Sequence, residues 1–232
     1  MKKSQLAYWI TAGLSAALTL AALGLTFFYA PTELTMGVVQ KIFYSHVPAA
    51  MCAYAGFIVG SGASLGYLFK PRKELDSVAR AGVEVGLLFC LYVLVSGPLW
   101  GYKAWGKAWV WDPQLTATFV LFLLYGGYFL LRLFSGPSER IRKIAAALAV
   151  FAVVDIPIVH YAVKKWGGLH PTVEREGGGG LAPAMKSTFS LSMLAFLLLF
   201  AALIWLSIRV KTRENRVEQL YLDVEDLARS RS

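Results

Sequence analysis

The chain has 232 residues, of which 57% are hydrophobic and only 16% are charged. A soluble globular domain carries about 25% charged residues, so the composition excludes an ordinary soluble protein and predicts an integral membrane protein. The net charge of +9 raises the question of nucleic acid binding. The basic residues, however, gather on one side of the apolar runs in the pattern of a membrane protein, and we expect no nucleic-acid partner.

Six apolar runs are each long enough to cross a bilayer, which needs about 20 residues of helix. They cover residues 6–30, 47–69, 79–98, 115–134, 144–163 and 187–208. We therefore predict an all-α integral membrane fold, one polytopic domain over residues 1–232 that forms a bundle of six transmembrane helices. The tail, 209–232, fits either a short surface helix or a disordered segment.

The distribution of charge predicts how the bundle is oriented. If the N-terminus is inside the cell, most of the 23 lysines and arginines fall on the inner side, which is the positive-inside pattern. This orientation makes both termini cytoplasmic. It assigns the segments 31–46, 99–114 and 164–186 to outer loops.

Four of the seven tryptophans lie in one outer segment, at Trp100, Trp105, Trp109 and Trp111. Tryptophan gathers at membrane–water boundaries because its indole is apolar and carries one N–H donor, and such a belt explains one or two of them. The run W-G-K-A-W-V-W-D, 105–112, favours a binding role beyond such a belt, because Gly106 lets the backbone turn and the rings could form a flat platform. We expect a planar apolar ligand there.

The histidines indicate what that ligand is. His46 follows the first predicted span and His170 the fifth, so both should share the outer face with the tryptophans, and His160 lies near it. Two neutral imidazoles can hold a haem iron axially while indoles cover the porphyrin. Cations of the outer loops could meet the propionates: Lys41, Lys103, Lys107, Lys164, Lys165 and Arg175. The alternative is that each histidine only binds a carbonyl or faces a lipid headgroup.

Three acidic residues have two interpretations each. Asp112 could orient a ligand or cap the helix that begins near Leu115. Glu84 could act within its span or pair with Arg80, four residues earlier. Asp155 could hydrogen-bond His160 or relay a proton, since charges inside spans are costly and often functional, or it could be structural.

Three segments carry a family resemblance. They are W-G-K-A-W-V-W-D-P-Q-L-T (105–116), Y-S-H-V-P-A-A (44–50), and P-I-V-H-Y (157–161) followed by Leu169-His170. The first resembles the signature of tryptophan-rich haem-handling proteins in cytochrome c biogenesis. All three in this order, on six spans, resemble the haem exporter protein C (CcmC) family over nearly the full chain.

The resemblance implies a protein of the bacterial inner membrane that presents haem rather than an enzyme. Haem b would be held transiently on the periplasmic face between His46 and His170, over Trp105, Gly106, Trp109, Trp111 and Asp112. His160, Trp100 and Asp155 would stand behind these residues. The haem would pass to the membrane-anchored chaperone CcmE, with the small subunit CcmD and the ABC transporter pair CcmA and CcmB as further partners, all in contact with membrane lipid.

Two other classes stay open at this point. A b-type cytochrome subunit would bind haem for electron transfer, but it usually buries its histidine pairs within helices at membrane depth. A solute permease would usually show internal repeats and helices broken at the midplane, and neither is clear in this sequence.

Overall fold

The computed structural model describes residues 3–136, 138–170 and 181–229, and these ranges form helices joined by short connections without a β-strand. The helices are α1 (Lys3–Gly24), α2 (Phe43–Phe69), α3 (Lys73–Trp105), α4 (Pro113–Phe134), α5 (Glu139–Ala152), α6 (Asp155–Trp166) and α7 (Pro183–Arg229). Within the described ranges, six helical segments are long and apolar enough to cross a membrane. The predicted all-α class with six spans is confirmed.

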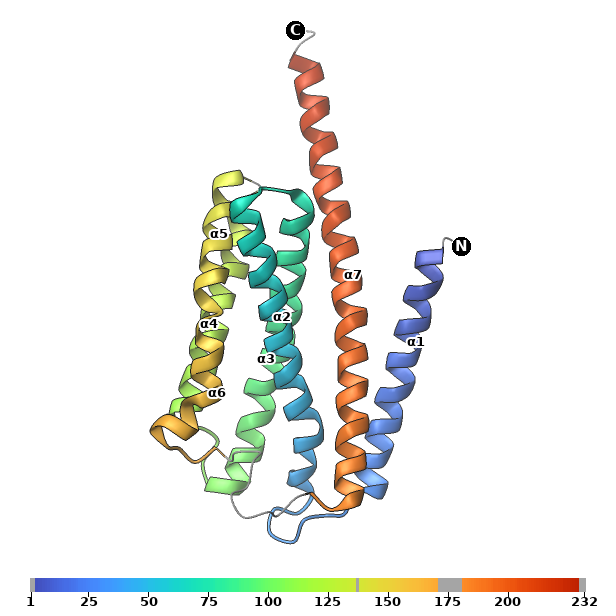
Figure 1. Ribbon diagram of the computed structural model, residues 1–232, viewed down its shortest axis with the longest axis vertical. Helices are drawn as coiled ribbons and strands as arrows, with labels where there is room; N and C mark the ends of the chain where they lie inside the picture. Colours follow the sequence, from blue (N-terminus) through green and yellow to red (C-terminus); the bar gives the residue numbers. More distant parts are fainter. Residues whose placement is uncertain (1–2, 137, 171–180, 230–232) are drawn as a thin grey trace.

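The helices run up and down in one bundle, and α5 and α6 together make one crossing (Figure 1). The start of α1 and the end of α7 lie toward the same end of the bundle (Figure 1). The connections from α1 to α2 and from α3 to α4, and the residues that follow α6, lie at the opposite end, which we call the outer end. The described parts of the three predicted outer loops therefore lie at the same end of the bundle.

Helices α2 and α3 approach each other closely, and four glycines allow it: Gly56 and Gly60 of α2, and Gly82 and Gly86 of α3. A Cβ atom on Gly82 of α3 would lie 2.5 Å from the backbone nitrogen of Gly60 in α2, and a Cβ on Gly60 would lie 2.9 Å from Val83. Only glycine allows backbones this close, as in small-residue contacts of membrane helices generally. The close approach fixes α2 and α3 as one unit, which carries His46 and its partners at the outer end.

Helices α2 and α3 extend beyond their predicted spans at the outer end, and both differences move candidate residues from loops onto helices. A short 3₁₀ helix, Val38–Ile42, leads directly into α2 at Phe43, so His46 lies in the first turns of a helix rather than before it. Helix α3 continues through Pro98 and ends only at Gly106, whose φ of +70° is the left-handed cap that favours glycine. Trp100 and Trp105 are therefore helical.

The fifth predicted span, 144–163, is divided. Helix α5 ends at Ala152 and α6 begins at Asp155, because Pro157 has no N–H to offer the carbonyl four residues earlier, at Val153. That carbonyl instead accepts from the backbone N–H of Ile156 at 3.1 Å. The partner that the freed carbonyl needs thus comes from a tighter local turn.

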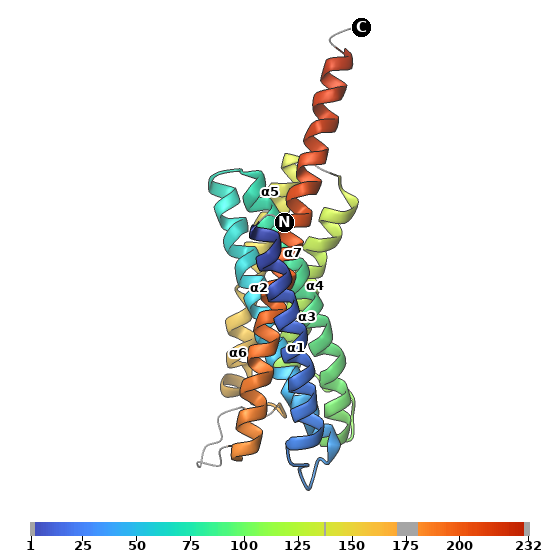
Figure 2. The same cartoon turned by 90° about the vertical axis from the view of Figure 1, so that its right-hand side faces the viewer.

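The sixth span and the tail form one helix, α7, which projects beyond the bundle at the end opposite the outer loops (Figures 1 and 2). The first turns of its polar part pack on α3. Lys211 forms a 2.9 Å ion pair with Glu84, and Glu214 forms a 3.0 Å pair with Arg80. The predicted pairing of Glu84 with Arg80 is wrong, because α7 supplies each of them with a closer partner.

A buried ion network joins four helices at this end. Asp76 of α3 lies 2.9 Å from Arg132 of α4 and 4.0 Å from Arg142 of α5. Arg142 also meets Glu218 of α7 at 2.8 Å. Because charges this deeply buried are stable only when paired, the network fixes how α4, α5 and α7 are placed around α2 and α3.

Candidate functional site at the outer end

His46 lies with its ring against α3. Its Nδ1 is 2.8 Å from the Ser96 hydroxyl, and a Cβ on Gly97 would come 3.4 Å from its Cε1. The Ser96 hydroxyl donates to the Tyr92 carbonyl at 2.8 Å, so its single hydrogen is committed and its oxygen accepts from Nδ1–H. A neutral imidazole in this tautomer keeps the lone pair of Nε2 available for a ligand.

Asp112 connects the tryptophan segment to the His170 segment. Its Oδ1 accepts from the backbone N–H of Leu115 at 2.8 Å and caps α4. Its Oδ2 accepts from the backbone N–H groups of Leu169 and His170, both at 3.2 Å. The interpretation of Asp112 as a helix cap is confirmed, and its second carboxylate oxygen also holds the backbone of the His170 segment.

The backbone before His170 is shaped to reach this carboxylate. Gly167 ends α6 with φ +73°, and Gly168 has φ +148°, conformations that side-chain-bearing residues rarely adopt. A Cβ on Gly168 would lie 3.1 Å from Asp112 Oδ2. The two glycines thus bring His170 back over the start of α4, where it is half-buried.

The tryptophans form two pairs, and neither pair has the flat arrangement expected of a platform. Trp100 and Trp105 meet edge to face, with ring centres 5.5 Å apart and planes at 85°. Trp109 and Trp111 are also 5.5 Å apart, at 79°, and both touch the edge of Phe119 from α4. Edge-to-face contact is the favoured geometry for neighbouring aromatic rings, so the site has walls of indoles rather than a level surface.

The two pairs differ in how they are held. Trp100 donates its Nε1–H to the Gln40 side chain at 3.2 Å, which ties α3 to the segment before α2. Trp109 is half-buried, and its Nε1 is buried without a hydrogen-bond partner among the described residues. Trp111 is 72% exposed. The second pair therefore offers an unused donor and an open ring face.

His160 and Asp155, expected behind the ligands, point elsewhere. Five positions turn a helix through about 140°, so the two side chains leave α6 on different sides. His160 is exposed and packs edge-on against Tyr161. Asp155 is half-buried, and its Oδ2 is buried without a hydrogen-bond partner among the described residues. The proposed Asp155–His160 hydrogen bond is wrong.

The outer loops bring basic residues to the same end. Lys103 and Lys107 are exposed beside the tryptophans. Lys41 donates to the Phe27 carbonyl at 3.0 Å. Arg175 lies outside the described residues, so its expected part in binding propionates is not addressed by the geometry.

The sequence analysis did not identify the residues that form hydrogen bonds with the candidate side chains. Ser96 and Gln40 orient His46 and Trp100 respectively. Ser96 lies four residues, about one helical turn, before Trp100, and a polar residue at this place in an otherwise apolar run indicates a hydrogen-bonding role. Gln40 gave no signal, because its contact spans 60 positions of sequence.

The fold and the site define a polytopic helical membrane protein with histidines and tryptophans gathered at one end of its bundle. The chain belongs to the heme exporter protein C (CcmC) family, whose model matches residues 1–223. It is 36% identical over 186 residues to Heme exporter protein C of Escherichia coli (strain K12), covering 79% of this chain and 74% of that protein.

Two further relatives carry the same name. Heme exporter protein C of Bradyrhizobium diazoefficiens is 34% identical over 196 residues, covering 83% of this chain and 74% of that protein. Heme exporter protein C of Paracoccus denitrificans is 32% identical over 215 residues, covering 91% and 88%. The similarity therefore extends over nearly all of the bundle rather than over the tryptophan segment alone.

Proposed function

We propose that this protein binds haem b non-covalently at the outer end of its bundle and presents it for c-type cytochrome biogenesis. His46 and His170 would be the axial ligands of the iron. One observation carries the proposal: Asp112 ties the backbone of His170 to the tryptophan segment, at the same end at which Ser96 orients His46. The names of the relatives, Heme exporter protein C, support the same cargo.

The residues present fit haem chemically. Haem iron takes four ligands from its porphyrin and needs axial donors from the protein, for which a neutral imidazole is suited. The hydrogen bond from Nδ1 of His46 to Ser96 is the kind of outer contact that fixes a ligand's tautomer and ring orientation. The exposed Lys103 and Lys107 offer partners for the carboxylates of the cargo.

The open arrangement suits transfer rather than storage. Trp111 is largely exposed, and His170 lies on a short loop held through backbone hydrogen bonds to one carboxylate. A cargo held at the edge of the bundle can be passed on after a small loop movement, whereas a haem enclosed between four helices could not. We therefore assign the protein a transfer role and no catalytic turnover of its own.

The receiving partner in this proposal is the membrane-anchored haem chaperone CcmE. CcmD and the transporter pair CcmA and CcmB complete the assembly in the bacterial inner membrane. The haem site then faces the periplasm and both termini face the cytoplasm. Neither a b-type cytochrome nor a solute permease is favoured by a feature of the site, since both histidines lie at the outer end.

The test is the absorbance spectrum of purified protein with and without each histidine. We expect the wild type, expressed with a haem supply, to show a low-spin bis-histidine spectrum, and His46→Ala and His170→Ala each to lose most of it. His160→Ala is the matched control, because it removes an exposed imidazole from the neighbouring helix and should leave the spectrum unchanged. Membrane insertion should be equal in all four proteins.

Two results would contradict the proposal. Unchanged haem content in both His46→Ala and His170→Ala would remove the ligand assignment. Wild-type protein that stays free of haem even when co-expressed with the chaperone would make the tryptophan walls a protein-docking surface instead. Rapid quinol oxidation by a stable haem would favour the cytochrome alternative.

A further inference from the structure

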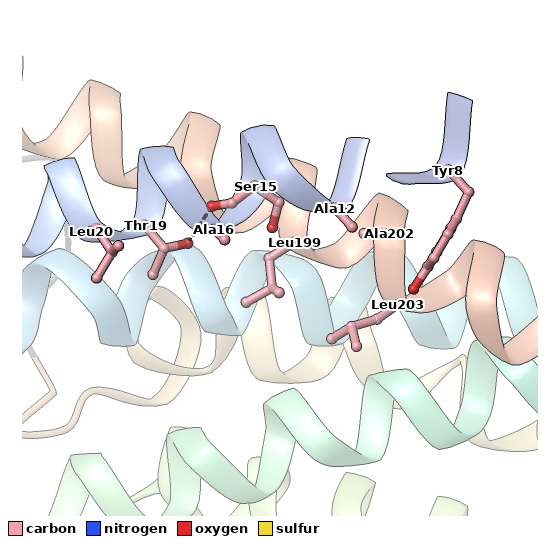
Figure 3. Close-up of a pocket in the computed structure, with 9 residues that line it drawn as sticks. All are labelled: Tyr8, Ala12, Ser15, Ala16, Thr19, Leu20, Leu199, Ala202 and Leu203. Atoms are coloured by element: carbon pink, nitrogen blue, oxygen red, sulfur yellow. Dashed lines mark hydrogen bonds between the residues drawn. The ribbon is translucent and has the colours of Figure 1, made fainter. Parts of the chain in front are cut away.

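Helix α1 lies at the edge of the bundle and packs mainly against α7 (Figure 1). Between the two helices is an open crevice of about 440 Å³, within the range of small-molecule sites, which is roughly 300–1,000 Å³. Figure 3 shows α1 residues from Tyr8 to Leu20 on one side and Leu199, Ala202 and Leu203 of α7 on the other. The crevice is lined by residues of α1 and α7, and none of them belongs to the candidate site at the outer end.

The lining of the crevice suits a hydrocarbon chain. Small side chains on α1, Ala12 and Ala16, leave the space that the leucines of α7 border. The Thr19 hydroxyl is committed to the Ser15 carbonyl at 2.8 Å, and Ser15 itself is buried. With the Thr19 hydroxyl bonded to its own helix and Ser15 buried, the accessible lining is mostly apolar, and it lies within a segment apolar enough to span a membrane.

The length of the crevice matches one leaflet. Tyr8 and Leu20 are 12 positions apart, which at 1.5 Å per residue corresponds to about 18 Å. Half of a typical hydrocarbon core is about 15 Å. The crevice therefore extends from the membrane boundary near the start of α1 to about the middle of the bilayer.

A cation stands at the boundary end of this crevice. The Arg209 guanidinium of α7 lies 5.7 Å from the ring centre of Tyr8, the residue that closes the crevice there. Among the described residues Arg209 has this ring as its neighbour and no carboxylate partner. Arg213 and Arg216 follow at four and seven positions, on the same helical face, and both are exposed.

On the other face of α7 the charged side chains are paired. There Lys211 is paired with Glu84, and Glu214 with Arg80. The arginines on the α1 side thus form a basic strip next to an apolar crevice. A basic pocket between transmembrane helices at the membrane surface is the kind of feature that binds anionic lipid headgroups.

We propose that the crevice is a binding site for one anionic phospholipid of the leaflet at the terminal end of the bundle. Its phosphate would pair with Arg209, and one acyl chain would lie along Ala12, Ala16 and Leu203. The lipid would fill the gap between α1 and α7 and so hold α1 to the bundle. The site is independent of the haem proposal and uses different residues.

The test is native mass spectrometry of the full-length protein in detergent, after extraction from vesicles of phosphatidylglycerol mixed with phosphatidylcholine. We expect the wild type to retain one phosphatidylglycerol. Arg209→Gln should lower that occupancy about five-fold, as for one arginine near a charged surface. Arg140→Gln is the matched control, because Arg140 is exposed at the same end but on α5, and it should retain lipid like the wild type.

A second variant separates the acyl chain from the headgroup. Ala16→Leu should reduce the retention of phosphatidylglycerol and of phosphatidylcholine alike, since the larger side chain fills the crevice. Circular dichroism verifies that this variant is folded. A photoreactive benzophenone side chain at position 16 should capture a phospholipid. Equal phosphatidylglycerol retention in Arg209→Gln and wild type, a wild type that retains none, or capture of a polypeptide in place of a lipid would overturn the proposal.

Discussion

The carboxylate of Asp112 accepts a hydrogen bond from the backbone N–H of His170 at 3.2 Å, across 58 positions of sequence. The same side chain caps α4 through Leu115 at 2.8 Å. One residue therefore sets the start of a helix and the position of a candidate ligand. The proposed haem site uses both roles of this carboxylate, since the one that reaches the His170 backbone joins that segment to the tryptophan segment.

Substitutions of Asp112 should reduce haem retention through its two roles, which are to cap α4 and to hold the His170 segment. Asp112→Ala removes the cap, which costs about 1 kcal/mol, and it also releases the His170 segment. We expect haem retention, measured by absorbance after purification, to fall about ten-fold, as is typical for loss of a residue that orients a ligand. Asp112→Asn should lie between, because its single carbonyl oxygen can serve the cap or the loop but not both.

The matched control for this prediction is Ser138→Ala. Ser138 caps α5 through Ile141 at 3.2 Å, at the end of the bundle opposite the site. It should lower thermal stability by a similar amount and leave haem retention unchanged. Equal haem loss in Ser138→Ala and Asp112→Ala would mean that retention follows overall stability rather than the placement of His170.

The hydrogen bond between Ser96 and His46 leads to a second prediction. Ser96→Ala removes the acceptor of Nδ1–H, so the imidazole loses its fixed tautomer and orientation. Haem affinity, measured by titration, should fall between about ten-fold and a hundred-fold. Ser61→Ala provides the comparison, because Ser61 is also buried and hydrogen-bonded, 2.8 Å from Tyr125 in the middle of the bundle; its haem affinity should equal that of the wild type.

Substitution of two tryptophans of similar exposure should affect haem retention and transfer differently. Trp111 is 72% exposed at the outer end and Trp9 is 63% exposed on α1. If the outer indoles contact haem, Trp111→Ala should reduce haem retention and transfer to the chaperone several-fold, and Trp9→Ala should not. The measurement is the covalent haem yield on the chaperone in cells. Equal effects of the two substitutions would support a simple aromatic belt at the membrane surface.

The buried network around Asp76 predicts a large effect on stability at the opposite end. Asp76→Ala leaves Arg132 and Arg142 buried, with side chains only 10% and 7% exposed, and without the shared carboxylate. Breaking a buried pair in this way costs about 3–5 kcal/mol. The melting midpoint in detergent should fall by roughly 10 °C.

Glu139→Ala is the comparison for Asp76→Ala. Glu139 pairs with Lys143 at 2.8 Å, but the two side chains are 64% and 49% exposed. Water screens such a pair, so the melting midpoint should hardly change. A small effect of Asp76→Ala as well would show that the network is solvated in the membrane-embedded protein.

Sequence alone determined the class of the fold and the neighbourhood of the candidate residues. Apolar runs of about 20 residues can only be satisfied as helices in a bilayer, so their number and limits followed from composition. Counting odd-numbered spans then predicted that the segments of His46, Trp105 and His170 meet at one end. The family resemblance rested on the same local segments and needed no geometry.

Only the tertiary structure decided how these residues are held. Periodicity could not show that α2 begins before His46 or that α3 continues to Trp105, because the ends of apolar runs do not mark the ends of helices. The Ser96–His46 contact and the second role of Asp112 join positions 50 and 58 apart in the chain. The first depends on how closely the glycines let α2 and α3 pack, and the second on how the segment after α6 returns to the start of α4; both are properties of packing rather than of local sequence.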